Sequence, residues 1–265
     1  MSATRLVATD LDGTLLHTDG TVTERTREVI AAIEDLGILV VFVTGRPIRW
    51  MEPLWQHVGD HGLAICSNGG IVYDVPGRSV IEYRAIPRDV GLEVATRIRA
   101  AVPDSVFAVE RANGGGREKG WPNRHDRPLA EIDEGPLEVI FADDVVKMLA
   151  LHTEMPPADY WARVEEEVGH LVTTTWSSVE ALVEMSGAGV TKGTTLELIC
   201  AERGIVAEEV VAFGDMPNDV TMLQWAGLSY AMANAHPLAQ EAADRIAPGN
   251  DEDGVAAVLE ELFLR

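Results

Sequence analysis

Two aspartates, Asp10 and Asp12, lie one residue apart near the start of the chain and are followed by Gly13 and Thr14. The apolar run before them, residues 6–8, is typical of a buried strand in a parallel sheet, and Gly13 favours a turn. Both carboxylates would then lie at the carboxyl end of a strand, where open α/β sheets bind ligands. They repel each other at this spacing, and a divalent cation would compensate them. A plain Asp-Gly turn without a chemical role is the alternative.

Two further predicted strands also end in polar residues. The apolar run 38–43 stops at Thr44-Gly45-Arg46, and the run 210–213 stops at Gly214-Asp215-Met216-Pro217-Asn218-Asp219. Because the carboxyl ends of parallel strands meet at one edge of a sheet, the three clusters predict a single site.

The residue types in these clusters suit the binding of a metal and a phosphate group. The aspartates of the first strand, together with Asp215, offer the oxygen ligands that octahedral Mg²⁺ prefers, with water completing the shell. Thr44 offers a hydroxyl, and Gly45 a backbone N–H near the start of a helix, which favours an anion. Lys192 would add a positive charge. A cation, backbone N–H groups and a lysine together predict a phosphate site.

The segments between these clusters alternate between helical and strand patterns. The first half predicts strand 6–8, helix 23–36, strand 38–43, helix 47–58, strand 63–66 and a hairpin of residues 71–73 and 79–83. The last part predicts helix 194–203, strand 210–213, helix 220–225, strand 228–232, helix 237–243, strand 245–247 and a terminal helix ending near residue 263. This order predicts an α/β fold with a doubly wound, Rossmann-like parallel sheet.

The middle of the chain has a different pattern and predicts an inserted α+β domain over residues 84–185. Its predicted elements are helix 87–101, strand 105–110, an irregular stretch 113–128, strand 145–152 interrupted by Lys147, helix 159–168, and strands 171–176 and 181–184. Half-polar strands of this kind suit a sheet with one solvated face. The core domain would then comprise residues 1–83 and 186–265.

The overall composition narrows the classes of function. The chain has 265 residues, 46% of them hydrophobic, and a formal charge of −22, which disfavours binding to nucleic acid or anionic membranes. No apolar run approaches the roughly 20 residues of a membrane span, and the start lacks a secretory signal, so we expect a cytoplasmic protein. Cys66 and Cys200 are expected to be buried free thiols. No pattern in the sequence indicates an oligomeric state.

The clusters, in their order along the chain, resemble the four motifs of the haloacid dehalogenase-like superfamily. The insert resembles the type IIB cap of its Cof-type hydrolases. The stretches carrying the resemblance are Asp10-Leu11-Asp12-Gly13-Thr14, Thr44-Gly45-Arg46, Lys192 and Gly214-Asp215-Met216-Pro217-Asn218-Asp219, with Ser67-Asn68-Gly69-Gly70 and Asn250-Asp251-Glu252-Asp253-Gly254-Val255 as further similar stretches.

The resemblance implies a Mg²⁺-dependent phosphatase that acts on a small phosphorylated metabolite, such as a sugar phosphate, through an aspartyl-phosphate. Asp10 would be the nucleophile and Asp12 the general acid and base. The other implied roles are a catalytic and phosphoryl-binding role for Lys192, and phosphoryl or substrate binding by Thr44, Gly45 and Asn218. The metal would be bound by Asp10, Asp215 and the main-chain carbonyl of Asp12, with Asp219 binding the metal or positioning the lysine or metal-bound water.

Four other functions share some of these features. A mannosyl-phosphoglycerate-type phosphatase would have the same core, and a phosphomutase would transfer the phosphoryl group instead of releasing it. A non-catalytic phosphate-ester-binding module is disfavoured by the full set of motif residues. A dehalogenase is disfavoured because carbon–halogen chemistry does not use an acid/base such as Asp12.

The remaining polar and aromatic residues are predicted to be structural. Arg46 is expected to have a secondary role, the six tryptophans, including Trp50, Trp55 and Trp176, to pack in the interior, and residues 250–253 to form a loop and helix cap. Ser67 and Asn68 fit either a polar turn or a substrate contact. Solvated loop positions are expected for Arg111, Arg117, Lys119 and His125.

Overall fold

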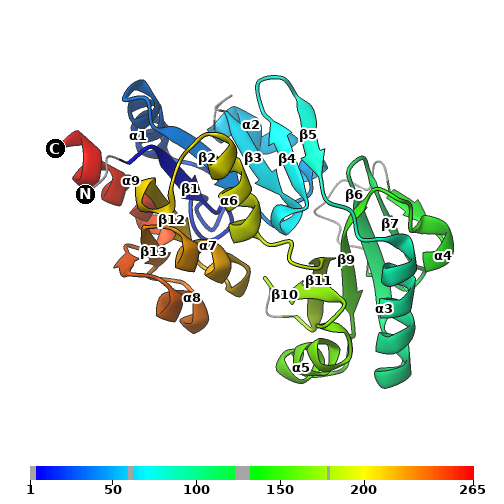
Figure 1. Cartoon of the computed structure of the whole chain (residues 1–265). Coiled ribbons are helices and arrows are strands. Elements are labelled where there is room, and N and C mark those ends of the chain that lie inside the picture. Colours follow the sequence, from blue (N-terminus) through cyan, green and yellow to red (C-terminus); the bar gives the residue numbers. More distant parts are fainter. Residues whose placement is uncertain (1–3, 59–61, 123–131, 178–179) are drawn as a thin grey trace.

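The chain forms two β-sheets, each with its own helices (Figure 1). The computed structural model describes residues 4–58, 62–122, 132–177 and 180–265. The first sheet uses strands from both ends of the chain, and the second uses strands from the middle. We call the part around the second sheet the cap and the remainder the core; the predicted domain boundaries at 83/84 and 185/186 remain a prediction.

The core sheet has eight strands in the order β14-β13-β12-β1-β2-β3-β4-β5. The strands from β14 to β3 pair in parallel, and the pairs β3–β4 and β4–β5 are antiparallel. The central strand β1 is buried along its whole length, as its apolar sequence predicts. The strand bounds are β1 (Leu6–Thr9), β2 (Leu39–Val43), β3 (Leu63–Cys66), β4 (Ile71–Asp74), β5 (Ser79–Tyr83), β12 (Val210–Gly214), β13 (Leu228–Met232) and β14 (Arg245–Ala247).

The helices of the core form two packed groups, α1 with α9 and α6 with α7 and α8 (Figure 1). Thr23 caps α1 as predicted, and Thr191 and Thr194 form a capping box at the start of α6. The single helix predicted over residues 47–58 is wrong, because a 3₁₀ turn over Ile48–Trp50 precedes α2. The helix bounds are α1 (Glu24–Asp35), α2 (Glu52–Val58), α6 (Lys192–Glu202), α7 (Val220–Trp225), α8 (Pro237–Ala242) and α9 (Gly254–Leu259).

The cap sheet has six strands in the order β10-β11-β9-β6-β7-β8 and is antiparallel except for the pair β7–β8. Its helices are α3 (Arg88–Ala101), α4 (Leu137–Ile140) and α5 (Pro157–Val168), of which α3 packs against α5. The strand bounds are β6 (Val106–Arg111), β7 (Gly115–Arg117), β8 (Ile132–Glu134), β9 (Val145–Leu151), β10 (Val172–Thr175) and β11 (Leu182–Gly187).

Two predictions about the cap sequence are wrong. The stretch predicted as irregular contains strand β7, whose Gly115 and Gly116 carry no β-strand preference but pair with β6. Residues 123–128 of that stretch lie outside the described residues. Lys147 does not interrupt its strand, since β9 is continuous and buried from Val145 to Leu151. Tertiary contacts therefore override local propensity at both places.

The α/β fold class is confirmed: a doubly wound parallel sheet carries an α+β cap between β5 and α6. Cys66 and Cys200 are both free and buried, as predicted. Within the described ranges, every helix is too short or too polar to cross a membrane.

The loop at residues 250–253 does more than cap a helix. The Asp253 carboxylate accepts hydrogen bonds from Thr23 (2.7 Å) and Thr26 (3.0 Å) and lies 3.0 Å from the ring of His17. The buried Asn250 amide donates to the carbonyl of Leu16 (2.9 Å). These contacts join the end of the chain to the segment that follows the Asp10/Asp12 turn. The prediction of a simple loop and cap was therefore incomplete.

Replacing Asp253 with glycine is expected to lower the free energy of unfolding by about 2 kcal/mol, because three donors lose an ionised acceptor. Glycine keeps the left-handed backbone found here, at φ 55°. Burial raises the pKa of Asp253, but the bonds from Thr23, His17 and Thr26 outweigh it and hold the pKa below its usual value. The Asp253 carboxylate therefore contributes fully to the free energy of unfolding above about pH 4, and this contribution disappears as the pH falls further. Denaturant titration checks this, with Asp104→Gly as the control, because Asp104 is exposed and also has a left-handed backbone, at φ 67°; equal stabilities of the two variants would contradict it.

Candidate active site

Four adjacent strands of the core sheet bring the predicted site residues to one edge. Strands β12, β1, β2 and β3 are neighbours and parallel, so their carboxyl ends lie together. Asp10 follows β1, Thr44 follows β2 and Asp215 follows β12. The backbone N–H of Asp10 donates to the carbonyl of Phe213 (3.0 Å), which ties the first and last of these loops together.

The centre of the site is a buried cluster of three carboxylates and one lysine. Asp10, Asp215 and Asp219 each present an oxygen within 4.8 Å of the others. The Lys192 ammonium is fully buried at the start of α6 and lies 2.6 Å from an oxygen of Asp10 and 2.6 Å from one of Asp219. Within the part of the chain that the structure describes, no cation pairs directly with Asp215, and its Oδ1 accepts a hydrogen bond from Thr14 (3.2 Å).

Asp219 also fixes the backbone of the loop after β12. Its second oxygen accepts from the N–H groups of Asp215 and Met216, both at 2.9 Å. On the other side of Asp215, Gly13 has a left-handed backbone at φ 76°, and a Cβ there would lie 2.3 Å from an Asp215 oxygen. The turn after Asp10 and Asp12 therefore requires glycine for two reasons, its conformation and the close approach of Asp215.

The electrostatics of this cluster favour an additional cation. Burial raises the pKa of Asp10 well above its usual value, and neighbouring Asp219 and Asp215 raise it further against the opposing effect of Lys192. Burial and the nearby Asp219 likewise raise the pKa of Asp215 to about 7. Three buried carboxylates with one lysine are thus short of positive charge. Their oxygen atoms and their mutual distances fit a divalent cation of the Mg²⁺ type.

Mg²⁺ is expected to raise the melting temperature more near pH 8 than near pH 5. Without the ion, the folded protein holds protons on Asp215 and Asp10 that the unfolded chain releases above about pH 4. Stability of the metal-free protein therefore falls as the pH rises towards 7, and a cation relieves this loss. Thermal unfolding with EDTA or Mg²⁺ at both pH values checks the prediction. Asp215→Asn should reduce the pH dependence and the Mg²⁺ effect together; an equal Mg²⁺ effect at both pH values would contradict it.

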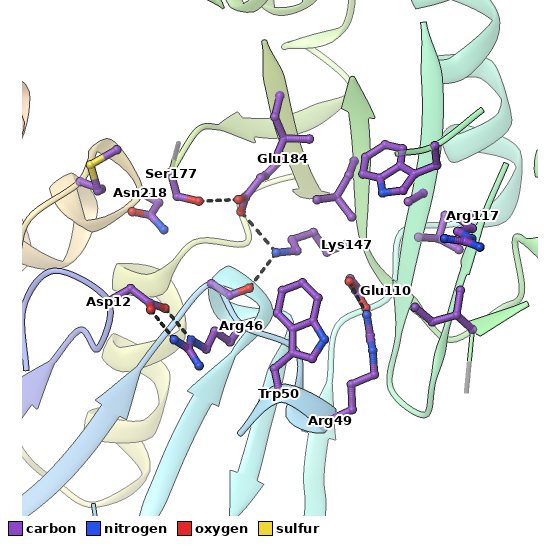
Figure 2. Close-up of a pocket in the computed structure, with 18 of the residues that line it drawn as sticks. Asp12, Arg46, Arg49, Trp50, Glu110, Arg117, Lys147, Ser177, Glu184 and Asn218 are labelled. Atoms are coloured by element: carbon purple, nitrogen blue, oxygen red, sulfur yellow. Dashed lines mark hydrogen bonds and ion pairs between the residues drawn. The ribbon is translucent and has the colours of Figure 1, made fainter. Parts of the chain in front are cut away.

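Asp12 points away from this cluster, towards the cap. Its side chain is 56% exposed, and both of its oxygens accept bonds from Arg46, at 2.7 Å from Nε and 2.5 Å from the terminal nitrogen (Figure 2). Asp12 is therefore an accessible carboxylate held in one orientation by a bidentate arginine. The prediction gave Arg46 only a secondary role, and this contact makes it the direct partner of a predicted site residue.

The residues predicted to bind phosphoryl oxygens divide into two layers. Gly45 and Asn218 line a cavity with Asp10, Asp12 and Asp215, while Thr44, Lys192 and Asp219 are buried behind them. The Asn218 side-chain oxygen is buried and has no hydrogen-bond partner among the residues that the structure describes. A buried acceptor of this kind is costly unless a ligand or a water molecule satisfies it.

The cavity has a volume of about 320 Å³ and lies between the core edge and the cap sheet (Figure 2). Its wall carries ion pairs as well as apolar groups. Arg49 from the core pairs with Glu110 of β6, and Lys147 of β9 pairs with Glu184 of β11. The apolar part of the wall is formed by Trp50, Ala108, Val109, Trp121, Pro122, Ile132, Leu149 and Leu182.

Several of these cavity residues were missed or misassigned from the sequence. Trp50 lines the cavity rather than packing in the interior, whereas Trp55 is buried against Tyr73 as predicted. Arg117 lies on β7 and lines the cavity, and Arg111 lies on β6 and donates to Asp133, so neither is a solvated loop residue.

The other two loop predictions have different outcomes. Lys119 is exposed as predicted, and His125 lies outside the described residues. The available signal for Lys147 and Glu184 was a charged residue in each of two largely apolar strands. Such residues are rarely buried unless they are paired.

Comparison with known proteins agrees with this architecture. Over 97% of its own length and 97% of the relative's, the chain is 29% identical to the 5-amino-6-(5-phospho-D-ribitylamino)uracil phosphatase YitU of Bacillus subtilis. It is also 29% identical, with the same coverage, to the pyridoxal phosphate phosphatase YbhA of Escherichia coli. The crystal structure of SMU.1108c from Streptococcus mutans matches with a TM-score of 0.87 at 22% identity, over 99% of this chain and 100% of that one.

The fold and the acidic sheet edge define an α/β protein with a candidate metal site at the carboxyl ends of its parallel strands. A family model of haloacid dehalogenase-like hydrolases matches residues 7–259, and the chain therefore belongs to that family. The predicted family, the Cof type with a type IIB cap, is confirmed, as is the predicted enzyme class, a phosphoric monoester hydrolase.

Proposed function

We propose that this protein hydrolyses a small phosphorylated metabolite, in the presence of Mg²⁺, through a phosphorylated Asp10. The observation that carries the proposal is the arrangement at the core edge. A buried carboxylate, Asp10, is held by Lys192 beside a charge-deficient acidic cluster, and the accessible Asp12 stands at the same cavity. One group is placed to attack phosphorus and the other to move a proton.

In the first step, an Asp10 carboxylate oxygen would form a bond to phosphorus as the bond to the leaving oxygen breaks. Asp12 would give its proton to that oxygen, and the alcohol would depart. In the second step, Asp12 would take a proton from water as the water oxygen bonds to phosphorus, which frees Asp10 and inorganic phosphate. The bidentate contact from Arg46 would hold Asp12 at the cavity while Asp12 is ionised, and one of its two bonds would break when Asp12 carries the proton.

The remaining residues would bind the phosphoryl group and the ion. The backbone N–H of Gly45 and the second amide N–H of Asn218 would donate to phosphoryl oxygens, with Thr44 supporting them from the buried layer, and Lys192 would orient Asp10. Mg²⁺ would be held by Asp10, Asp215 and the main-chain carbonyl of Asp12, with Asp219 beside it. When bound, the ion neutralises charge that develops on the phosphoryl oxygens.

A sugar phosphate or a similar phosphomonoester would fit the cavity. A volume of about 320 Å³ suits a small leaving group, and the wall offers ion pairs for hydroxyls beside the indole of Trp50. The two relatives named above act on small phosphate esters according to their names. The two free cysteines are consistent with work in the reducing cytoplasm.

A panel of phosphorylated metabolites, incubated with the protein and Mg²⁺, tests the proposal by the release of inorganic phosphate. We expect release from a subset of phosphomonoesters, and none from any of them with the Asp10→Asn variant. Transfer of phosphate between positions of the substrate without net release would indicate a phosphomutase. Tight binding of esters without turnover would indicate a binding module, and either result would contradict the proposal.

A further inference from the structure

Two charged side chains of the cap, Lys147 and Glu184, are buried where the cap meets the core. Lys147 lies in β9 and is 4% exposed; Glu184 lies in the neighbouring strand β11 and is 5% exposed. Figure 2 shows both pointing from the cap sheet towards the core edge that carries Asp12 and Asn218. Burying two charged side chains is costly, so the groups that they contact indicate their role.

Lys147 binds the backbone of the core rather than a core side chain. Its ammonium donates to the carbonyl oxygen of Gly45 at 2.7 Å and lies 3.3 Å from Glu184 (Figure 2). Gly45 follows β2 and lines the cavity beside the acidic cluster. A residue of the cap therefore fixes the position of a peptide group in the loop proposed to bind phosphate.

Glu184 reaches the same part of the core through Asn68. The Asn68 amide donates to Glu184, and the Asn68 carbonyl oxygen accepts from the amide of Asn218 (3.1 Å). The other Glu184 oxygen accepts from Ser177 of the cap. Burial raises the pKa of Glu184, but the Lys147 charge and the bonds from Ser177 and Asn68 outweigh it and lower the pKa below its usual value. The carboxylate is therefore ionised and fully engaged by protein groups.

The backbone of the segment that carries Asn68 is strained. Ser67 and Asn68 both have left-handed conformations, at φ 51° and 57°, which are uncommon for residues other than glycine. The Ser67 hydroxyl is buried and finds no partner among the described residues. Strain of this kind persists only where the surroundings fix it, and it is often found at functional sites. Gly45 lies so close that a Cβ there would be 2.9 Å from the Asn68 oxygen.

We propose that Lys147 and Glu184 are positioning residues through which the cap fixes the phosphate-binding loop of the core. Lys147 holds the Gly45 peptide, and Glu184 holds the Asn68–Asn218 pair. This inference rests on the proposed function, since it gives Gly45 and Asn218 their role at the phosphoryl group.

The variants Lys147→Met, Glu184→Gln and the double variant test this proposal. Each single variant leaves one buried charge unpaired and is expected to be destabilised, whereas the double variant removes both charges and should recover most of the melting temperature. Activity should not recover with it, because the Gly45 carbonyl still lacks its donor. We expect kcat of the double variant to stay roughly ten- to a hundredfold below that of the wild type. Lys119→Met, an exposed substitution of the same type in the cap, is the control.

The affinity for inorganic phosphate, measured by calorimetry in the presence of Mg²⁺, is the second readout. Inorganic phosphate lacks the organic leaving group of a substrate. Weaker phosphate binding by the double variant would therefore show that Lys147 and Glu184 act on the phosphate-binding loop. If the phosphate affinity and kcat are unchanged and only KM is higher, the proposal is overturned, and Lys147 and Glu184 instead bind the leaving group of the substrate. Recovery of both kcat and stability would overturn it in favour of a purely structural pair. A wild-type protein that binds phosphate but turns over no ester would refute the proposed function, and the affinity comparison would still test the inference.

Discussion

Replacing Asp10 with asparagine is expected to reduce the release of phosphate from p-nitrophenyl phosphate by roughly a thousandfold or more, because the substitution removes the nucleophile. Asparagine has the same shape as aspartate, and Lys192 keeps its second partner, Asp219, at 2.6 Å. The fold should therefore survive, since the buried lysine is not left without a carboxylate. A colorimetric assay with Mg²⁺ measures the rate, and circular dichroism checks that the variant is folded.

The matched control for this variant is Asp35→Asn. Asp35 is exposed at the end of α1, so the same chemical change there should leave the rate within about twofold of the wild type. Undiminished turnover by the folded Asp10→Asn variant would show that Asp10 is not the nucleophile and would contradict the proposed mechanism.

Replacing Lys192 with methionine is expected to have a large effect on stability as well as on activity. The wild-type ammonium is buried between Asp10 and Asp219, and although burial lowers its pKa, these two carboxylates raise it above its usual value. Without it, three buried carboxylates have no cation. We expect the free energy of unfolding near pH 8 to fall by about 3 kcal/mol, the cost of breaking a buried ion pair.

The loss should be smaller near pH 5, where the carboxylates can bind protons instead. Mg²⁺ should restore part of the stability, but not the rate, since Asp10 would no longer be oriented. Denaturant titration at both pH values, with and without Mg²⁺, measures this, and the exposed Lys119→Met serves as the control. A Lys192→Met variant as stable as the control near pH 8 would show that the acidic cluster does not need the lysine.

The core and the centre of the site could be predicted from the sequence because local patterns carry that information. Continuous apolar runs such as β1 and β12 indicate buried parallel strands, and the polar residues after them lie at one edge by the geometry of such sheets. Asp10, Thr44 and Asp215 were placed together in this way. Lys192 could be suggested as a positive charge for a phosphate group, but its place in the motif order came from the resemblance to a known family, since a single lysine at a helix start has no distinctive pattern.

The cavity wall could not be predicted, because it depends on how the cap lies on the core. Lys147 reads as a polar interruption in a strand until Glu184 and the Gly45 carbonyl are placed beside it. Trp50 and Arg49 lie in a 3₁₀ turn where a single helix was predicted, and this local geometry aims both residues into the cavity. These contacts join residues that are far apart in the sequence, so the pattern of apolar and polar residues within one segment does not predict them.

The most direct test of the account is to identify the phosphorylated residue. The Asp12→Asn variant lacks the group proposed to activate water, but p-nitrophenol needs no acid to depart, so the first step should proceed and the intermediate should accumulate. Acid quenching followed by peptide mass spectrometry should then find one phosphoryl group on the peptide that contains Asp10, lost on treatment with base. A phosphoryl group on any other residue, or release of nitrophenol with no labelled peptide at all, would contradict the central claim that Asp10 is the nucleophile.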